Sequence, residues 1–78
     1  MMSDKPLIII ARDKRQADAY AYSNGIAEYI HASNADHLRG LERGLDYAWV
    51  PEFSYMVDDR RYLEISKILV AREHKPVR

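Results

Sequence analysis

The segment Leu7-Ile8-Ile9-Ile10-Ala11 decides the fold of this chain. All of its residues are apolar, and the β-branched isoleucines favour a strand over a helix. A strand that is apolar on both faces is typical of a parallel sheet covered by helices on both sides. We therefore predict that this segment is the central strand of such a sheet. Arg12 ends the strand, and residues 1–6 are expected to form a short flexible lead-in.

A helix is expected immediately after this strand. Asp13 can cap the helix, and Gln16 follows three residues later, which is the D-x-x-Q form of a capping box. Gly25 is suited to the left-handed conformation that closes many helices. Together these signals predict a helix over residues 14–24.

The middle of the chain predicts a second strand, a short helix and a third strand. Residues 27–32 alternate enough between apolar and polar side chains to form a strand nearer the edge of the sheet. Ser33 or Asn34 can cap a short helix that runs to about Arg43. Residues 47–50 are expected to form the third strand.

The C-terminal part predicts one longer helix between a loop and a tail. Pro51 stops the third strand, and residues 52–57 are expected to form a loop. Asp58 can then cap the last helix. Since Pro76 cannot continue a helix, residues 74–78 are expected to form a basic tail.

The predicted order of elements is therefore β-α-β-α-β-α. Parallel strands need long crossover connections, which helices usually supply, and these crossovers are right-handed. The predicted fold class is α/β, a minimal Rossmann-like fold with a three-stranded parallel sheet in the order 2-1-3. Because the chain has only 78 residues, we expect a single domain over residues 1–78.

The composition excludes several classes of protein. The 12 Lys and Arg residues balance 12 Asp and Glu residues, whereas non-specific binding to duplex DNA depends on a positive excess. The lack of cysteine excludes disulfides, thiolate catalysis and cysteine-based metal sites, and it suits a reducing cytoplasm. No apolar run approaches the roughly 20 residues that span a bilayer. We therefore expect a cytoplasmic protein with neither a membrane segment nor a signal peptide.

Residues 7–50 resemble nucleotide-binding α/β folds and, more narrowly, the second RecA-like domain of helicases. The resemblance is carried by the strand Ile8-Ile9-Ile10, the helix opening Arg15-Gln16-Ala17, and the strand ending His31-Ala32-Ser33. The chain lacks the G-x-x-x-x-G-K-[ST] phosphate loop, and Pro51-Glu52-Phe53 stands in the place of an arginine-finger motif. The resemblance therefore implies a Rossmann-like fold but does not carry over the phosphate loop or the arginine finger.

The whole chain also resembles small proteins encoded by bacteriophages of actinobacteria. This resemblance is carried by the run ARDKRQADAY at residues 11–20, together with the small size of the chain. It implies an accessory role in the cytoplasm of a bacterial host, often through contact with a host protein.

Candidate ligand-binding residues follow the ends of the first two strands. In open parallel sheets, ligands bind beyond the carboxyl ends of the strands, and a helix N-terminus flanked by cations can hold a phosphate. Two features oppose such a site: no glycine lets a pyrophosphate approach the backbone, and the Asp13 carboxylate can occupy the amides itself. The candidates for anion binding are Arg12, Lys14, Arg15, Ser33 and Asn34.

The aromatic content points instead to an interface. Six tyrosines and one tryptophan exceed what so small a domain can bury, and both residue types are enriched at protein interfaces. The last predicted helix is also apolar around more than half of its circumference, which one sheet face cannot cover. We therefore expect a protein partner or a homodimer. The interface candidates are Tyr22, Trp49, Phe53, Tyr55, Leu63 and Val70.

Catalysis, metal binding and nucleic-acid binding have less support. No serine lies in a G-x-S-x-G elbow, so we assign no catalytic residue and expect no enzyme activity. His31, His37 and Asp36 do not have the spacing of a known ligand set, so we expect no metal and no cofactor. Basic residues gather toward the C-terminus among acidic neighbours that dilute their charge. They are Arg60, Arg61, Lys67, Arg72, Lys75 and Arg78.

The leading functional prediction is a non-catalytic protein-interaction module. It associates with itself and contacts a phage or host protein. Two alternatives remain open: a module that binds a nucleotide or phosphate at the carboxyl ends of the strands, and a nucleic-acid accessory protein that uses the C-terminal basic residues.

Overall fold

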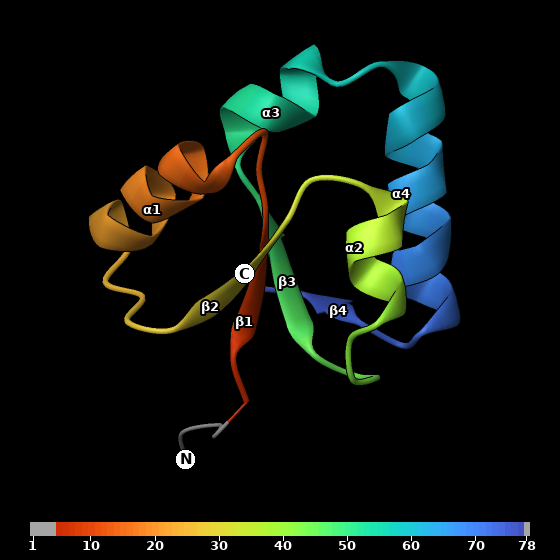
Figure 1. The fold of residues 1–78 in the computed structure, drawn as a ribbon, viewed down its shortest axis with the longest axis horizontal. Helices are drawn as coiled ribbons and strands as arrows, with labels where there is room; N and C mark the ends of the chain where they lie inside the picture. Colours follow the sequence, from red (N-terminus) through yellow and green to blue (C-terminus); the bar gives the residue numbers. More distant parts are fainter. Residues whose placement is uncertain (1–4, 78) are drawn as a thin grey trace.

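The structure is a computed structural model and describes residues 5–77. The strands form one parallel sheet in the order β2-β1-β3-β4 (Figure 1). The α/β class, the central place of β1 and the 2-1-3 order of the first three strands are thus confirmed. The elements are β1 (Leu7–Ile10), α1 (Lys14–Ser23), β2 (Tyr29–Ala32), α2 (Ala35–Arg39), β3 (Asp46–Trp49), α3 (Pro51–Met56), α4 (Asp59–Ala71) and β4 (Lys75–Pro76).

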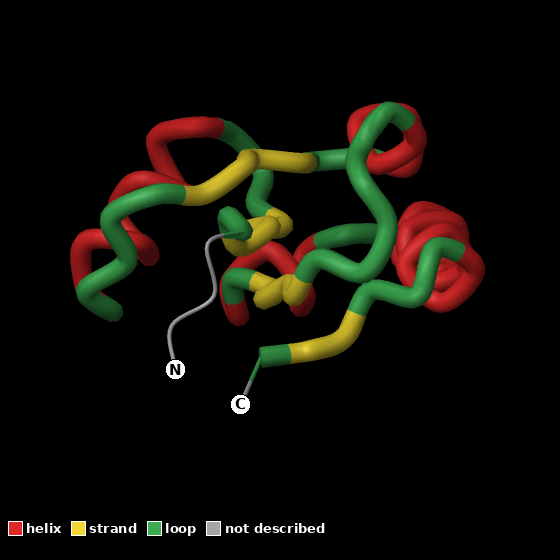
Figure 2. The backbone as a smooth tube through the Cα atoms, turned by 90° about the horizontal axis from the view of Figure 1, so that it is seen from below, coloured by secondary structure: helices red, strands yellow, loops and turns green. Residues whose placement is uncertain are grey.

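Helices cover the two faces of the sheet unequally. Figure 2 shows α1 on one side of the strands and α2 with α4 on the other. The right-handed crossovers explain this arrangement. The connection from β1 to β2 moves along the sheet in one direction, and the connections from β2 to β3 and from β3 to β4 move in the other, so their helices lie on opposite faces. The side chains agree: Tyr29 of β2 bonds to Asp18 of α1, and Trp49 of β3 lies against Tyr62 of α4 with ring centres 4.9 Å apart.

The predicted central strand is the most deeply buried one. Ile8, Ile9 and Ile10 have no exposed surface. Because side chains alternate along a strand, Ile9 faces α1 and its isoleucine neighbours face α2 and α4. Each fully buried isoleucine contributes about 1.5–3 kcal/mol to the hydrophobic stabilisation. On the α1 side, Ala17 and Ala21 are buried, and their small side chains let the helix lie close to the sheet.

Polar residues cap the three helices that the sequence predicted, α1, α2 and α4. Asp13, Asn34 and Asp58 each accept a hydrogen bond from the backbone N–H three residues later. Gly25 follows the C-cap of α1 with a φ of +67°, in the left-handed region. Its N–H and that of Ile26 bond back to the last turn, which completes the helix end.

The predicted loop over residues 52–57 is wrong, because residues 51–56 form the short helix α3. Pro51 does end β3, but it also occupies the first helical position. A helix leaves that N–H without an intrahelical partner, so a residue that lacks it is favoured there. The proline therefore starts a helix as well as stopping a strand.

The basic tail predicted over residues 74–78 is also wrong in the part that the structure describes. Lys75–Pro76 form β4, so the sheet has four strands and not three. The Val77 N–H donates to the Tyr47 carbonyl at 2.8 Å. Pro76 fits there because β4 is an edge strand, which tolerates a missing N–H. Arg78 lies outside the described residues.

Other boundaries differ by a few residues. The second strand begins at Tyr29, not at residue 27. The second helix ends at Arg39, before Gly40, instead of continuing to about Arg43. Of the predicted lead-in over residues 1–6, residues 1–4 lie outside the described part, and Lys5 pairs with Glu42 at 3.0 Å.

Candidate functional site

The carboxyl ends of β1, β2 and β3 meet at one edge of the sheet. Backbone hydrogen bonds hold the chain together just past the strands: the Ala11 N–H donates to Ala32 at 3.0 Å, and the Val50 N–H donates to Ile10 at 2.9 Å. The turn from β1 into α1, the cap of α2 and the start of α3 therefore lie beside one another. This edge contains most of the polar side chains for which the sequence predicted a ligand site.

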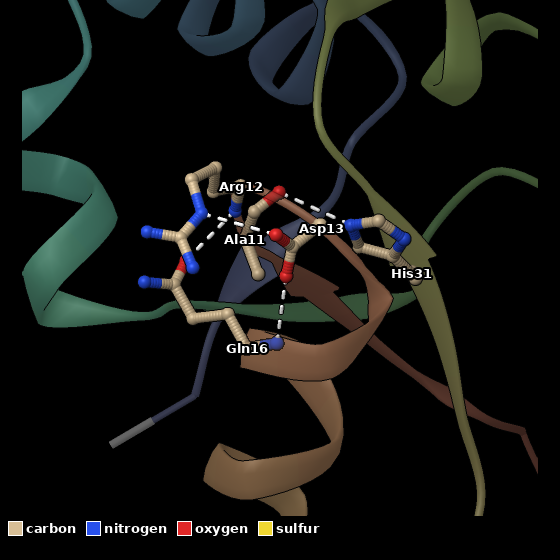
Figure 3. A network of polar contacts seen from close by, with 5 residues as sticks. All are labelled: Ala11, Arg12, Asp13, Gln16 and His31. Atoms are coloured by element: carbon tan, nitrogen blue, oxygen red, sulfur yellow. Dashed lines mark hydrogen bonds and ion pairs between the residues drawn. The ribbon is translucent and has the colours of Figure 1, made fainter.

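The first turn is a closed polar network (Figure 3). The Gln16 N–H donates to Asp13 at 2.9 Å, and the Arg12 Nε–H donates to the second Asp13 oxygen at 3.1 Å. The Gln16 side-chain oxygen accepts the Arg12 N–H at 2.8 Å, one residue earlier than in a standard capping box. The hydrogen bond from the Gln16 backbone N–H lowers the pKa of the Asp13 carboxyl most, and the hydrogen bond from the Arg12 side chain lowers it further.

Two histidines close the edge on the side of β2. The His31 Nε2–H donates to the Ala11 carbonyl at 3.1 Å (Figure 3), while His37 Nδ1 accepts the Ser33 N–H at 3.1 Å. The two rings lie edge to face with centres 6.3 Å apart. Asn34 caps α2 through its side-chain oxygen. Ser33 and Asn34 are therefore engaged in ordering this turn.

Lys14 and Arg15 take no part in the polar network of the first turn. Lys14 donates to Asp18 at 3.0 Å and to the Tyr29 hydroxyl at 3.2 Å, and the hydrogen bond to Asp18 raises the Lys14 pKa. The Tyr29 hydroxyl also donates to Asp18, which lowers the pKa of that carboxyl. Arg15 is exposed and bonds to no residue within 5–77. Of the three predicted cations, Arg12 is the one that belongs to the polar network of the edge.

A second cation reaches this edge from a distant part of the chain. Arg61 of α4 lies over the Phe53 ring of α3, with its guanidinium carbon 5.7 Å from the ring centre. A hollow of about 270 Å³ separates α3 and the start of α4 from the first turn. We call it the arginine hollow. Its lining residues are Arg12, Gln16, Phe53, Met56, Val57, Asp58 and Arg61.

Sequence reasoning missed the part of Gln16 and Arg61 in this hollow. The turn between α3 and α4 brings Arg61 back to the carboxyl edge, and α3 was predicted as a loop. The sequence does contain a signal for α3: Pro51-Glu52 follows a strand, and a proline followed by an acidic residue is typical of the first turn of a helix.

The interface candidates divide into buried and exposed residues. Phe53 is only 5% exposed, and Trp49 is half-buried, stacked on Phe53 with ring centres 5.9 Å apart. Tyr22 on α1 and Tyr55 on α3 are almost fully exposed. Trp49 and Phe53 therefore hold α3 against the sheet, and the tyrosines point to solvent.

The outer side of α4 carries the remaining candidates. Leu63 is 56% exposed and Val70 is 77% exposed, although Ile65 and Leu69 on the inner side are buried. These two exposed residues are seven positions apart and so lie on one side of the helix. The neighbouring residues make a shallow and mostly apolar surface, which we call the α4 face. It is formed by Leu63, Ser66, Lys67, Val70 and Ala71.

Two of the C-terminal basic residues are engaged within the molecule. Arg72 donates from its guanidinium to the Leu41 carbonyl at 2.7 Å, and Arg61 lies on Phe53. Within residues 5–77, no group of three or more acidic or histidine side chains is placed to hold a metal ion. No helix in the same range is long and apolar enough to cross a membrane.

Comparison with known proteins identified no relative: no protein-family model, no curated protein and no solved structure matches the chain. The two candidate surfaces are therefore defined by their own residues. They are the arginine hollow at the carboxyl edge and the α4 face on the outside of the molecule.

Proposed function

We propose that this protein is a non-catalytic interaction module that pairs with a second copy of itself through the α4 face. The observation that carries the proposal is the exposure of Leu63 and Val70 on one side of a helix whose other side is buried. Removing such apolar surface from water favours association. Lys67 lies within the face, and its long alkyl chain can cover apolar neighbours while its charged end reaches water.

The order of residues along α4 fits an antiparallel pair. In a two-fold arrangement centred between Ser66 and Lys67, Leu63 of one copy lies opposite Val70 of the other. Arg60 in the first turn of α4 then lies toward the end of the second helix, where Glu73 of that copy, two residues past Ala71, pairs with its own Arg43 at 3.9 Å and can accept a second cation. The antiparallel dipoles of the two helices add to this. The α4 face is therefore complementary to itself.

A small area limits the strength of the pair. A helix of 13 residues is roughly 20 Å long, and one helix pair falls near the lower end of interface sizes. We expect a dissociation constant in roughly the micromolar range. Such a pair exchanges readily, so the same face is also available to a different protein.

The proposed setting is the cytoplasm of a bacterial host, where the protein acts as an accessory factor. The resemblance to actinobacteriophage proteins and the lack of cysteine support this part of the proposal. In that setting the partner is a host or phage protein that presents an apolar helix to the α4 face.

Sedimentation equilibrium across a range of concentrations tests self-association. We expect the wild type to pass from monomer to dimer in the micromolar range, and Leu63→Glu or Val70→Glu to remain monomeric, because each places a charge inside the apolar contact. Tyr22→Glu is the matched control, since Tyr22 is 90% exposed on α1 and should leave the equilibrium unchanged. A wild type that stays monomeric at all these concentrations would falsify the proposal.

A further inference from the structure

We propose that the arginine hollow is a binding site for a phosphate monoester that carries one small apolar group. The hollow lies at the carboxyl edge of the parallel sheet, on the side of the molecule where α3 meets the first turn. Its lining joins two arginines, one glutamine and an apolar wall of Met56 and Val57, from segments that are far apart in the sequence. This site is separate from the α4 face and does not depend on self-association.

The polar donors of the hollow converge from two directions. Arg12 uses its Nε–H on Asp13, which leaves its two terminal nitrogens for a ligand (Figure 3). The Gln16 oxygen already accepts the Arg12 N–H, so the Gln16 amide nitrogen is the group left to donate. Arg61 stacks on Phe53, and a stacked guanidinium still directs its N–H groups sideways in its own plane. Three separate donor groups suit the three terminal oxygens of a phosphate better than the two of a carboxylate.

The negative charges nearby are already engaged. Asp58 accepts the Arg61 backbone N–H at 2.8 Å, and Asp13 accepts the Gln16 N–H and the Arg12 Nε–H. These carboxylates occupy the amides at the starts of α4 and α1, so the guanidinium groups and not the helix ends must hold the anion. With Asp13 paired to Arg12 at 3.1 Å, two arginines balance two aspartates here, so the site depends on directed N–H groups and not on a net positive charge.

The apolar residues of the lining indicate which chemical group the phosphate carries. Val57 and Met56 form an apolar wall, with Met56 largely exposed and flexible enough to adapt its shape. The Phe53 ring lies between Trp49 and the Arg61 guanidinium, so it supports Arg61 from beneath. A volume of about 270 Å³ accommodates a phosphate joined to a single small apolar group. An inorganic phosphate would leave this apolar surface in contact with water.

An NMR titration of the full chain with phenyl phosphate tests the site. We expect the Arg12 and Arg61 Nε–H signals and the Gln16 side-chain amide signals to shift together. Arg61→Gln and Arg12→Gln should each weaken binding about tenfold or more, because each removes a charged donor. Arg15→Gln is the matched control, since Arg15 is exposed beside the same turn but does not line the hollow. Inorganic phosphate and benzyl alcohol should each bind at least about tenfold more weakly than phenyl phosphate.

Other results would overturn the assignment. They are unchanged arginine signals at millimolar phenyl phosphate, an Arg15→Gln effect as large as that of Arg61→Gln, or equal binding of inorganic phosphate. Arg61→Lys keeps the charge but not the guanidinium fork and should give intermediate binding, and its backbone spectrum shows whether the fold is retained. Leu63→Glu should bind phenyl phosphate as the wild type does, so failure of this site and failure of the proposed dimer are distinguishable.

Discussion

Asp13 is the residue on which the start of α1 depends, and its ionisation makes that start sensitive to acid. Hydrogen bonds lower the pKa of its carboxyl in the folded state below the ordinary value of 3.8. The unfolded chain therefore takes up the proton more readily than the folded one does. The Asp13 contribution to stability is fully present above about pH 3.8 and is lost as the pH falls through the lower folded-state pKa.

Replacing Asp13 tests this acid sensitivity. Asp13→Ala should lower the urea midpoint of unfolding at pH 7, and its difference from the wild type should shrink as the pH falls below 3.8. Asp13→Asn keeps a side-chain oxygen that can cap the helix but cannot ionise, so it should show less loss of stability in acid. If Asp13→Ala lowers the urea midpoint by the same amount at pH 7 and in acid, the ionised Asp13 carboxylate does not have this role.

Glu73 is the second residue with a marked effect on its helix, because it has a φ of +63° just after α4. The Glu73 N–H bonds to Val70 and the His74 N–H to Leu69, which is the helix end that glycine usually forms. Glu73→Gly should raise the free energy of unfolding by about 1 kcal/mol, since it removes left-handed strain that exceeds the entropy cost of glycine. Chemical denaturation measures the change. Glu73→Ala keeps the strain and should not stabilise; a glycine variant no more stable than the alanine variant would show that the strain is absent.

At the scale of elements, β1 is the strand that the whole sheet is built around. Ile9→Ala removes a side chain with no exposed surface and should cost about 2–5 kcal/mol of unfolding free energy. This is a large share of the roughly 5–15 kcal/mol available to a small domain. Tyr55→Ala, which truncates an exposed side chain, should change it by less than about 0.5 kcal/mol. Denaturation curves measure both changes, and equal losses of unfolding free energy in Ile9→Ala and Tyr55→Ala would contradict the central place of β1.

Arg60 in the first turn of α4 and Glu73, which lies two residues past the helix and pairs with Arg43 of its own chain, give a test of the antiparallel geometry. Arg60→Glu should weaken self-association because it brings Glu73 of the second copy against a like charge. Glu73→Arg should weaken it in the same way, and the double variant should restore it. Sedimentation equilibrium measures all three. If the double variant is weaker than either single one, the helices do not pair in this direction.

The elements differ in how well the sequence predicts them. The isoleucine run of β1 and the capping residues Asp13 and Asp58 are local signals, so the central strand and the two long helices were predictable. By contrast, α3 and β4 depend on tertiary contacts. Pro51 is compatible with both the end of a strand and the start of a helix, and Lys75–Pro76 is a strand only because β3 offers it an edge.

For the molecule as a whole, the candidate site was predictable in place but only partly in composition. The carboxyl edge follows from the parallel order of the strands, and Arg12 belongs to it. The side-chain partners of Lys14 and the return of Arg61 over Phe53 depend on how α1 meets β2 and how α3 turns into α4. Those contacts join residues far apart in the chain, so no local pattern shows them.

Self-association should also couple to the stability of the molecule. Because the dimer forms only from folded chains, its apparent melting temperature should rise with protein concentration. Leu63→Glu should melt at the same temperature at every concentration. Differential scanning calorimetry over a wide concentration range measures this. A wild-type melting temperature that does not change with concentration would count against the pair.

The most direct test of the α4 pairing is chemical crosslinking of a chain that has no cysteine of its own. Ser66→Cys places a thiol at the centre of the α4 face, and Tyr22→Cys places one on α1, outside the contact. With a short bis-maleimide at micromolar protein, we predict that the Ser66→Cys chain becomes a covalent dimer and that the Tyr22→Cys chain stays mostly monomeric. Equal crosslinking of both variants, or crosslinking of Tyr22→Cys alone, would contradict the account.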